Sequence, residues 1–371
     1  MTILNRLKSN LYNIPGWRTN RKILVIESDD WGSIRIPSNE TYNKLKAMGI
    51  ELESNPFNQY DSLETEEDLE ALFQILKNYH DKNGNHPVVT ANFAVANPDF
   101  NKIKESRFTE YFYEPITETY KRSKNCNNSL ALIKKGIEEK VFCPQYHCRE
   151  HLNVITWLKL LRNGRKDLLQ AFDLETCGID IKGLPANRQN LMAAYDYSDL
   201  PGLEFVLNSI NDGVSIFKKI FGFEPHSSMA PSNLWDDVIE SCLAANGIKF
   251  IQSYVVQKYP VNNSRIKRYR YTGQKNSYGQ YYFVRNCYFE PSTNNNYDWL
   301  KECMQKISTS FLFRKPAIIT THRLNFIGTV FKENREKNLF LFDKLLKQIT
   351  EEFPDVEFLN SVELGKIIQE I

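Results

Sequence analysis

The chain has 371 residues, of which 42% are hydrophobic and 25% charged, and its formal net charge is +2. This composition is ordinary for a globular protein, and the small net charge gives no global case for nucleic acid binding. The seven cysteines are odd in number and form no C-x-x-C pair, which favours reduced thiols over a disulfide framework. No run approaches the roughly 20 apolar residues that span a bilayer, and the N-terminus lacks a signal-peptide pattern, so we expect a cytoplasmic protein.

Apolar strand-like runs alternate with segments of helical periodicity along almost the whole chain. In chain order, strands are predicted at residues 22–27, 87–95, 141–146, 225–230, 248–254, 281–289, 317–321 and 356–359. Helices are predicted at 64–80, 129–140, 154–162, 200–222, 233–245, 296–308 and 333–353, and a last helix capped by Ser361.

Strands separated by helices imply a mainly parallel sheet, and seven or eight such units favour a closed barrel. We therefore expect an α/β fold in one domain over residues 1–371, with residues 1–20 as an extension that packs on the barrel. The long connections near 48–63, 96–128 and 173–200 are interpreted as loop insertions.

Residue types suited to metal binding and proton transfer follow three of these strands. Asp29 and Asp30 come after the first strand, His147 and His151 after the third, and His322 ends the seventh. Barrel enzymes build their sites from the loops after the strands. Two His and one carboxylate leave an open position on a divalent metal, and a second carboxylate and a third His remain for moving protons. Together these residues indicate a metal-dependent hydrolase.

Each motif also has a structural interpretation. The acidic pair could be an ordinary turn or helix cap, and both carboxylates reach one pocket only if the chain turns, which Gly32 allows. The spacing of His147 and His151 would place both imidazoles on one face of a helical turn, but two core or surface histidines would have the same spacing. A lone His, such as His322, is more often structural.

In combination, the motifs resemble those of the polysaccharide deacetylases, also called the NodB-homology or carbohydrate esterase family 4 group. The resemblance covers the chain from about residue 22 to the C-terminal helix and implies a distorted (β/α)7-type barrel. It implies that Asp29 is the catalytic base, that Asp30, His147 and His151 hold one divalent metal, and that His322 is the general acid. Zinc suits these ligands best, with cobalt, nickel or iron as alternatives.

The chain departs from the family pattern at three places. Trp31 precedes Gly32 where the family has Gly directly, and Cys148 stands where the family has Ser or Thr. The family's Arg-x-Pro motif, which orients the base, falls on residues 229–231, where Met replaces the Arg. Arg149 or Arg323 could substitute for it. These differences indicate a divergent branch and leave the substrate more open than the metal site.

Several residues beside the site loops are candidates for substrate binding. The two indoles could stack on a sugar or pack in the core, while the polar side chains could hydrogen-bond or pair with a ligand. The candidates are Trp31, Arg149, Asn233, Trp235 and Arg323.

The segment from Arg265 to Arg270 is basic with an interleaved Tyr. It is either a solvated loop or strand edge, or a weak contact to a membrane surface, an anionic glycan or a phosphate-linked carrier.

The resemblance implies removal of acetyl groups from N-acetylated or O-acetylated sugars of a polysaccharide or glycan precursor. Two alternatives stay open at this point. One is a hydrolase of another amide or ester on the same scaffold. The other is a non-catalytic glycan-binding barrel in which the missing Arg marks lost activity.

Overall fold

The computed structural model describes residues 12–181, 183, 191–261 and 264–370. Its main sheet has nine strands in the order β10-β7-β6-β5-β2-β1-β12-β11, and β13 pairs with the first part of β1. Every pairing in this sheet is parallel. The strands are β1 (Lys22–Trp31), β2 (Val89–Ala94), β5 (Phe142–Cys148), β6 (Ser227–Met229), β7 (Phe250–Tyr254), β10 (Tyr281–Arg285), β11 (Cys287–Tyr288), β12 (Ala317–His322) and β13 (Val356–Phe358).

The sheet curls until its two ends almost meet. β10 and β11 stand at opposite ends of the strand order, yet only Asn286 separates them in the chain. The backbone N–H of Asn286 donates to the carbonyl of Ile318 on β12, and its side-chain amide donates to the carbonyl of Pro316. The predicted α/β barrel of mainly parallel strands is therefore confirmed.

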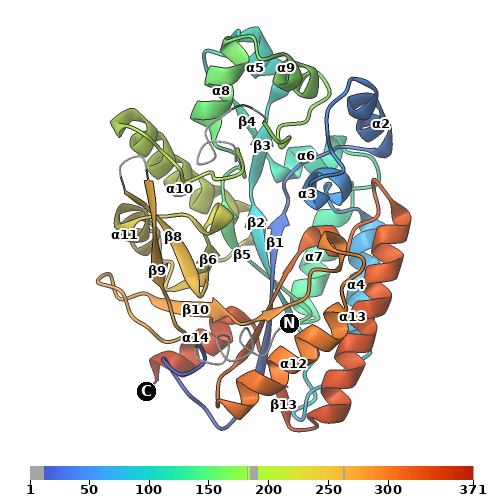
Figure 1. The fold of residues 1–371 in the computed structure, drawn as a ribbon, viewed down its shortest axis with the longest axis vertical. Coiled ribbons are helices and arrows are strands. Elements are labelled where there is room, and N and C mark those ends of the chain that lie inside the picture. Colours follow the sequence, from blue (N-terminus) through green and yellow to red (C-terminus); the bar gives the residue numbers. More distant parts are fainter. Residues whose placement is uncertain (1–11, 182, 184–190, 262–263, 371) are drawn as a thin grey trace.

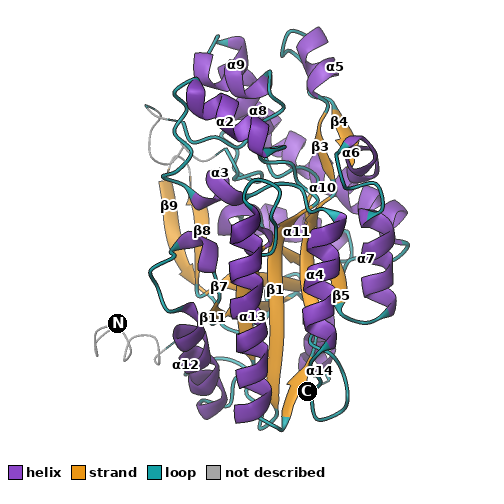
Figure 2. Ribbon diagram, turned by 90° about the vertical axis from the view of Figure 1, so that its right-hand side faces the viewer, coloured by secondary structure: helices purple, strands orange, loops and turns teal. Residues whose placement is uncertain are grey.

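Amphipathic helices surround the strands (Figure 1, Figure 2). They bury one apolar face each in the core that they share with the strands, as α13 does with Leu339, Phe342 and Leu346. The last helix is capped by Asn360, one residue before the predicted Ser361, and the Asn360 side chain accepts two backbone hydrogen bonds. The helices are α4 (Glu66–Lys77), α7 (Ser129–Glu138), α10 (Leu200–Phe221), α11 (Asp237–Ala245), α12 (Trp299–Leu312), α13 (Lys332–Glu352) and α14 (Ser361–Gln369).

The insertions lie above the carboxyl ends of the strands, at the top of Figure 1. The predicted insertion 48–63 contains α3 (Pro56–Tyr60), and the predicted insertion 96–128 contains β3 (Ala96–Pro98), α5 (Phe100–Glu105), β4 (Tyr113–Pro115) and α6 (Ile116–Arg122). Three helices outside the predicted insertions, α2 (Asn39–Ala47), α8 (Val154–Arg162) and α9 (Lys166–Phe172), share with α5 an apolar cluster separate from the main core, which includes Tyr42, Leu161 and Phe172.

An antiparallel hairpin, β8 (Val256–Val261) and β9 (Ser264–Tyr269), stands outside the main sheet. It contains most of the basic segment that the sequence left as a loop or strand edge. Among the residues that the structure describes, short 3-10 turns lie at Pro231–Asn233, Pro291–Thr293 and Arg323–Asn325.

The described part of the N-terminal extension lies against the barrel. The backbone N–H of Trp17 donates to the carbonyl of Thr272, and Lys315 donates to the carbonyls of Pro15, Gly16 and Trp17. Residues 1–11 of the predicted extension lie outside the described residues, and the single-domain assignment stays a prediction. Within the described ranges, no helix combines the length and apolar character needed to cross a bilayer.

Candidate functional site

The carboxylates of Asp29 and Asp30 lie at the end of β1, where the strand loses its regular geometry. The pairing of β1 with β2 shifts register immediately after Ser28. Asp30 has a φ of 76°, in the left-handed region that residues with a Cβ seldom adopt. Gly32 follows at a φ of 79°, and a Cβ there would lie 2.4 Å from the carbonyl oxygen of Ala94. Because the chain turns here, both carboxylates can line the same cleft.

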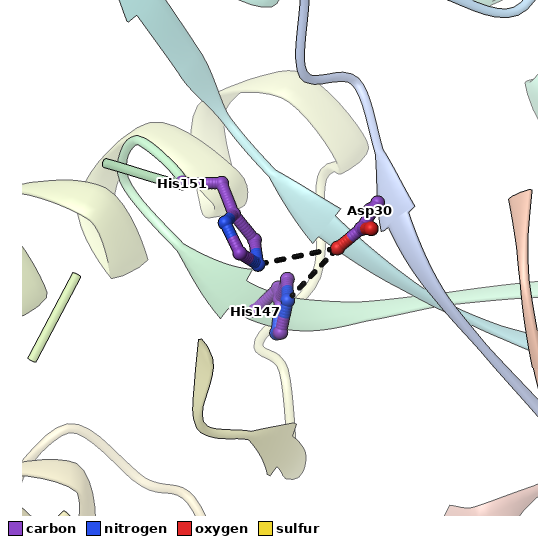
Figure 3. A group of neighbouring side chains, drawn as sticks. All are labelled: Asp30, His147 and His151. Carbon is purple, nitrogen blue, oxygen red and sulfur yellow. Dashed lines mark ion pairs between the residues drawn. The ribbon is translucent and has the colours of Figure 1, made fainter. Parts of the chain in front are cut away.

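Asp30, His147 and His151 form a group of three potential metal ligands (Figure 3). One oxygen of Asp30 lies 3.5 Å from Nε2 of His147 and 3.2 Å from Nε2 of His151. The three ligand atoms lie within 4.8 Å of one another. His147 belongs to β5 and His151 to the bend after it, so a strand end, not the helical turn considered from the spacing, brings the two imidazoles together.

The protonation states in this group suit a cation. Burial would raise the pKa of Asp30, but the two imidazoles outweigh burial and hold that pKa well below its usual value. Burial lowers the pKa of His151 and so favours its neutral form. A carboxylate binds a metal in its ionised form and an imidazole in its neutral form, and these are the forms favoured for Asp30 and His151.

The hydrogen bonds of His147 also fit a metal. Its Nδ1 lies 2.5 Å from the carbonyl of Met229, which fixes the proton on Nδ1 and leaves a lone pair on Nε2. That Nε2 atom is buried and has no hydrogen-bond partner. An unsatisfied buried acceptor is costly, and a cation between it and Asp30 would satisfy it.

Asp29 is held by Arg285, a residue that sequence reasoning missed. The guanidinium makes two hydrogen bonds to the Asp29 carboxylate, at 2.5 and 2.7 Å, and Asn92 donates a third at 2.7 Å. Burial alone would raise the pKa of Asp29, but the charge and hydrogen bonds of Arg285 outweigh burial and lower this pKa to about 2. Asp29 is therefore an ionised carboxylate with a fixed orientation, as a general base requires.

Arg285 thus fills the position for which Arg149 or Arg323 was suggested, and that suggestion was wrong. It comes from the end of β10, is fully buried and also pairs with Glu27 at 2.8 Å. Arg285 directly follows the apolar run 281–284, and a polar residue directly after such a run is the same pattern that indicated the other site residues.

His322 lies on the other side of Asp29, with its Nε2 3.8 Å from an Asp29 oxygen. Its Nδ1 is 2.6 Å from Glu290, a second residue that the sequence reasoning missed. Burial would lower the pKa of His322, but the charge of Glu290 outweighs it and raises the pKa to about 10. Glu290 is itself fixed by Asn325, whose amide donates to its other oxygen. His322 can therefore hold a proton beside the candidate base.

A cleft of about 600 Å³ lies at the carboxyl ends of the strands. It is lined by the two aspartates and three histidines described above, but not by Arg285 or Glu290. Of the predicted substrate-binding residues, Asn233 lines this cleft, while its amide donates to the carbonyl of Val256. The other lining residues are Asp29, Asp30, Arg35, Asn55, Phe57, His147, His151, Asp180, Met192, Met229, Ala230, Ser232, Tyr254, Val256, Lys258 and His322.

The two indoles do not lie in the cleft. Trp31 is 1% exposed and donates to the hydroxyl of Ser28, and Trp235 is fully buried and donates to Glu240. Both pack in the main core, so the core alternative describes them better than sugar stacking does.

The two predicted arginines are also directed elsewhere. Arg149 is 6% exposed and pairs with Glu150 at 2.6 Å. Arg323 is fully buried and pairs with Asp61 at 3.0 Å and Glu64 at 2.8 Å. Their charges are already compensated inside the protein, so the structure does not offer them to a substrate.

Part of the basic segment is likewise compensated. Arg265 pairs with Asp196 and Arg268 with Asp237, each at 2.8 Å, and Arg270 donates to Gln257. The alternative of a solvated strand edge therefore accounts for these arginines, and the contacts do not support a membrane-surface role.

Comparison with known proteins found similarity in fold only. No family model matches the chain, and no match was found among curated proteins. Among solved structures, a protein described as a glycoside hydrolase/deacetylase from Parabacteroides distasonis superposes with a TM-score of 0.51 and 10% identity, over 96% of this chain and 73% of its own.

Two polysaccharide deacetylases align with lower scores. That of Mycobacterium smegmatis gives a TM-score of 0.44 at 9% identity over 96% of this chain and 93% of its own. That of Pseudomonas aeruginosa PAO1 gives a TM-score of 0.45 at 10% identity, over 94% of this chain and 91% of its own. Of these three structures, the Parabacteroides protein has a TM-score above 0.5, and at 10% identity its similarity to this chain concerns the barrel fold alone.

Proposed function

We propose that this chain is a metal-dependent hydrolase that removes acetyl groups from N-acetylated or O-acetylated sugars of a polysaccharide or glycan precursor. The observation that carries the proposal is the convergence of five side chains in one cleft. Asp30, His147 and His151 form the candidate metal group, with Asp29 and His322 beside it. The barrel shared with the Parabacteroides protein is consistent with this activity.

Asp30, His147 and His151 would hold the metal, with zinc expected first. A divalent metal there would polarise an acyl carbonyl and make a water molecule acidic near neutral pH. Asp29 would take the proton of the attacking water, since Arg285 keeps its carboxylate ionised and fixes its direction.

His322 would then protonate the leaving group. An amide nitrogen is expelled only as the amine, so the reaction needs an acid at this point, and the imidazolium favoured by Glu290 provides one. For an O-acetyl group the same proton would go to the leaving alkoxide.

The non-catalytic alternative rested on a missing Arg. Because Arg285 makes the two hydrogen bonds to Asp29 that this Arg would supply, the reason for expecting lost activity is removed. A cytoplasmic location remains part of the proposal and can be tested by cell fractionation.

The test combines metal analysis with acetate release. Purified protein, stripped with a chelator and reloaded with zinc, cobalt, nickel or iron, is assayed on a panel of N-acetylated and O-acetylated sugars. We expect one equivalent of metal and metal-dependent acetate release. His147→Ala should bind no metal, and Lys249→Ala, at the opposite end of the barrel, should bind it normally. A protein that stays metal-free at saturating zinc would refute the proposal.

A further inference from the structure

The rim of the cleft carries a cation that nothing in the described chain neutralises. Lys258, on β8 of the hairpin, lines the same cleft as Asp29 and Asp30. Among the described residues, no carboxylate forms an ion pair with it. The residues outside the described ranges include no Asp or Glu side chain. Lys258 therefore has no carboxylate side chain as a partner within this chain.

The neighbours of Lys258 carry charge of the same sign. Lys267 lies directly across the hairpin ladder from it. Like charges at opposite positions of an antiparallel pair destabilise the pair. Lys258 is exposed at the rim, but the protein around its ammonium group and the charge of Arg265 lower its pKa from the usual value. Hence an anion beside Lys258 would relieve an unfavourable arrangement.

The carboxylates that line the cleft are otherwise engaged. Asp29 pairs with Arg285, and Asp30 belongs to the candidate metal group. Asp180 accepts two hydrogen bonds from Asn55 at the α3 side of the cleft. None of these acids compensates Lys258.

A second cation faces the cleft from another element. The Nε atom of Arg35 donates to Asn58, and its guanidinium lies 5.3 Å from the centre of the Phe57 ring. Arg35 forms no ion pair in the described part of the chain, and the nearby Asp61 already pairs with Arg323. The cleft thus offers a second positive charge, which lies near His151 of the candidate metal group.

We propose that the substrate carries a negative charge, as a carboxylate or phosphate group, and that Lys258 binds this group at the rim of the cleft. This inference rests on the proposed function and narrows its substrate to acidic acetylated sugars. A neutral acetylated glycan would leave Lys258 without a counter-charge. The two sources of the anion, a uronic acid and a sugar phosphate, share this chemistry and are separated by the probes below.

The test measures binding, so that it does not depend on turnover. Zinc-loaded Asp29→Asn protein is titrated calorimetrically with the methyl glycoside of N-acetylglucosamine, with the corresponding uronic acid and with N-acetylglucosamine 1-phosphate. We expect at least one acidic probe to bind about tenfold more tightly than the neutral one, with an advantage that shrinks at high salt. The acidic probe that binds more tightly than the neutral one shows whether the negative charge comes from a uronic acid or from a sugar phosphate.

Variants then locate the contact. In the Asp29→Asn background, Lys258→Gln and Lys258→Glu should reduce the ratio of acidic to neutral affinity about tenfold. Lys249→Glu makes the same change of charge at the opposite end of the barrel and should leave that ratio unchanged. Equal affinity for all three probes, no binding of any of them, or a preference that survives both Lys258 variants would overturn the inference.

The two proposals fail in distinguishable ways. Equal acetate release from neutral and acidic sugars by the wild-type enzyme would refute the acidic substrate while leaving the hydrolase intact. A preference for acidic probes without acetate release from any of the three sugars would count against the hydrolase alone.

Discussion

The floor of the cleft and its rim differ in how they handle charge. On the floor, the ends of parallel strands place acids and bases in fixed pairs, such as Asp29 with Arg285 and His322 with Glu290. On the rim, the β8–β9 hairpin leaves Lys258 beside other cations. A floor whose charges are balanced internally suits chemistry that must occur in the same geometry on every substrate. A rim with uncompensated charge is suited to selecting one substrate over another.

The largest effect should follow from neutralising the base on the floor. We expect Asp29→Asn to lower kcat by about a thousandfold, because the amide cannot accept the proton from water. Zinc content, measured on the same preparation, should not change, since Asp29 is outside the ligand group. Normal turnover by Asp29→Asn protein would show that the base has been misassigned.

The next largest effect should come from the buried counter-charge. Arg285→Met leaves Glu27 and Asp29 buried without their partner, which should cost about 3–5 kcal/mol in the free energy of unfolding. Arg268→Met removes the partly exposed pair with Asp237 and should cost less than about 1 kcal/mol. Urea titrations of both variants give the comparison, and equal losses would contradict the distinction between floor and rim.

The pH dependence of stability tests the pair of His322 and Glu290. The pKa of His322 in the folded protein, about 10, lies above its unfolded value near 6.5. The pair therefore stabilises the metal-free protein fully below about pH 6.5, and this contribution is lost as the pH rises towards 10. Glu290→Gln should be less stable than wild type at pH 6, and the gap should close by pH 10. If the difference in stability between Glu290→Gln and wild type did not depend on pH, His322 would not be a protonated partner of Glu290.

The smallest effect on catalysis should come from the buried indole of Trp235. Trp235→Phe removes a hydrogen bond to Glu240 and should cost about 1–2 kcal/mol of stability. Because Trp235 does not reach the cleft, KM for an acetylated sugar should stay the same. A large rise in KM without a change in thermal stability would return Trp235 to the substrate site.

Much of the floor could be predicted because it follows local rules. Polar residues directly after apolar strands meet at one end of a parallel barrel, and this placed Asp30, His147 and His151 in one group. The same rule would have identified Arg285, which ends β10. Arg149 and Arg323, which were suggested instead, lie next to the site histidines in the sequence, but their side chains pair with other acids.

Other assignments failed because the sequence does not show which way a side chain points. His322 lines the cleft, whereas the adjacent Arg323 turns away to buried carboxylates, including Asp61. Successive residues of an extended chain point to opposite sides, so proximity to a catalytic residue does not place a side chain in the site. Glu290 contacts His322 from 32 positions away, which only the folded chain reveals.

The most direct measurement is a crystal structure of the protein grown with zinc, with the ion located by anomalous scattering. We predict one strong peak between Asp30, His147 and His151, about 2.0–2.2 Å from one oxygen and two Nε2 atoms. Zinc bound elsewhere at full occupancy, with these three side chains left without a metal, would contradict the proposed centre.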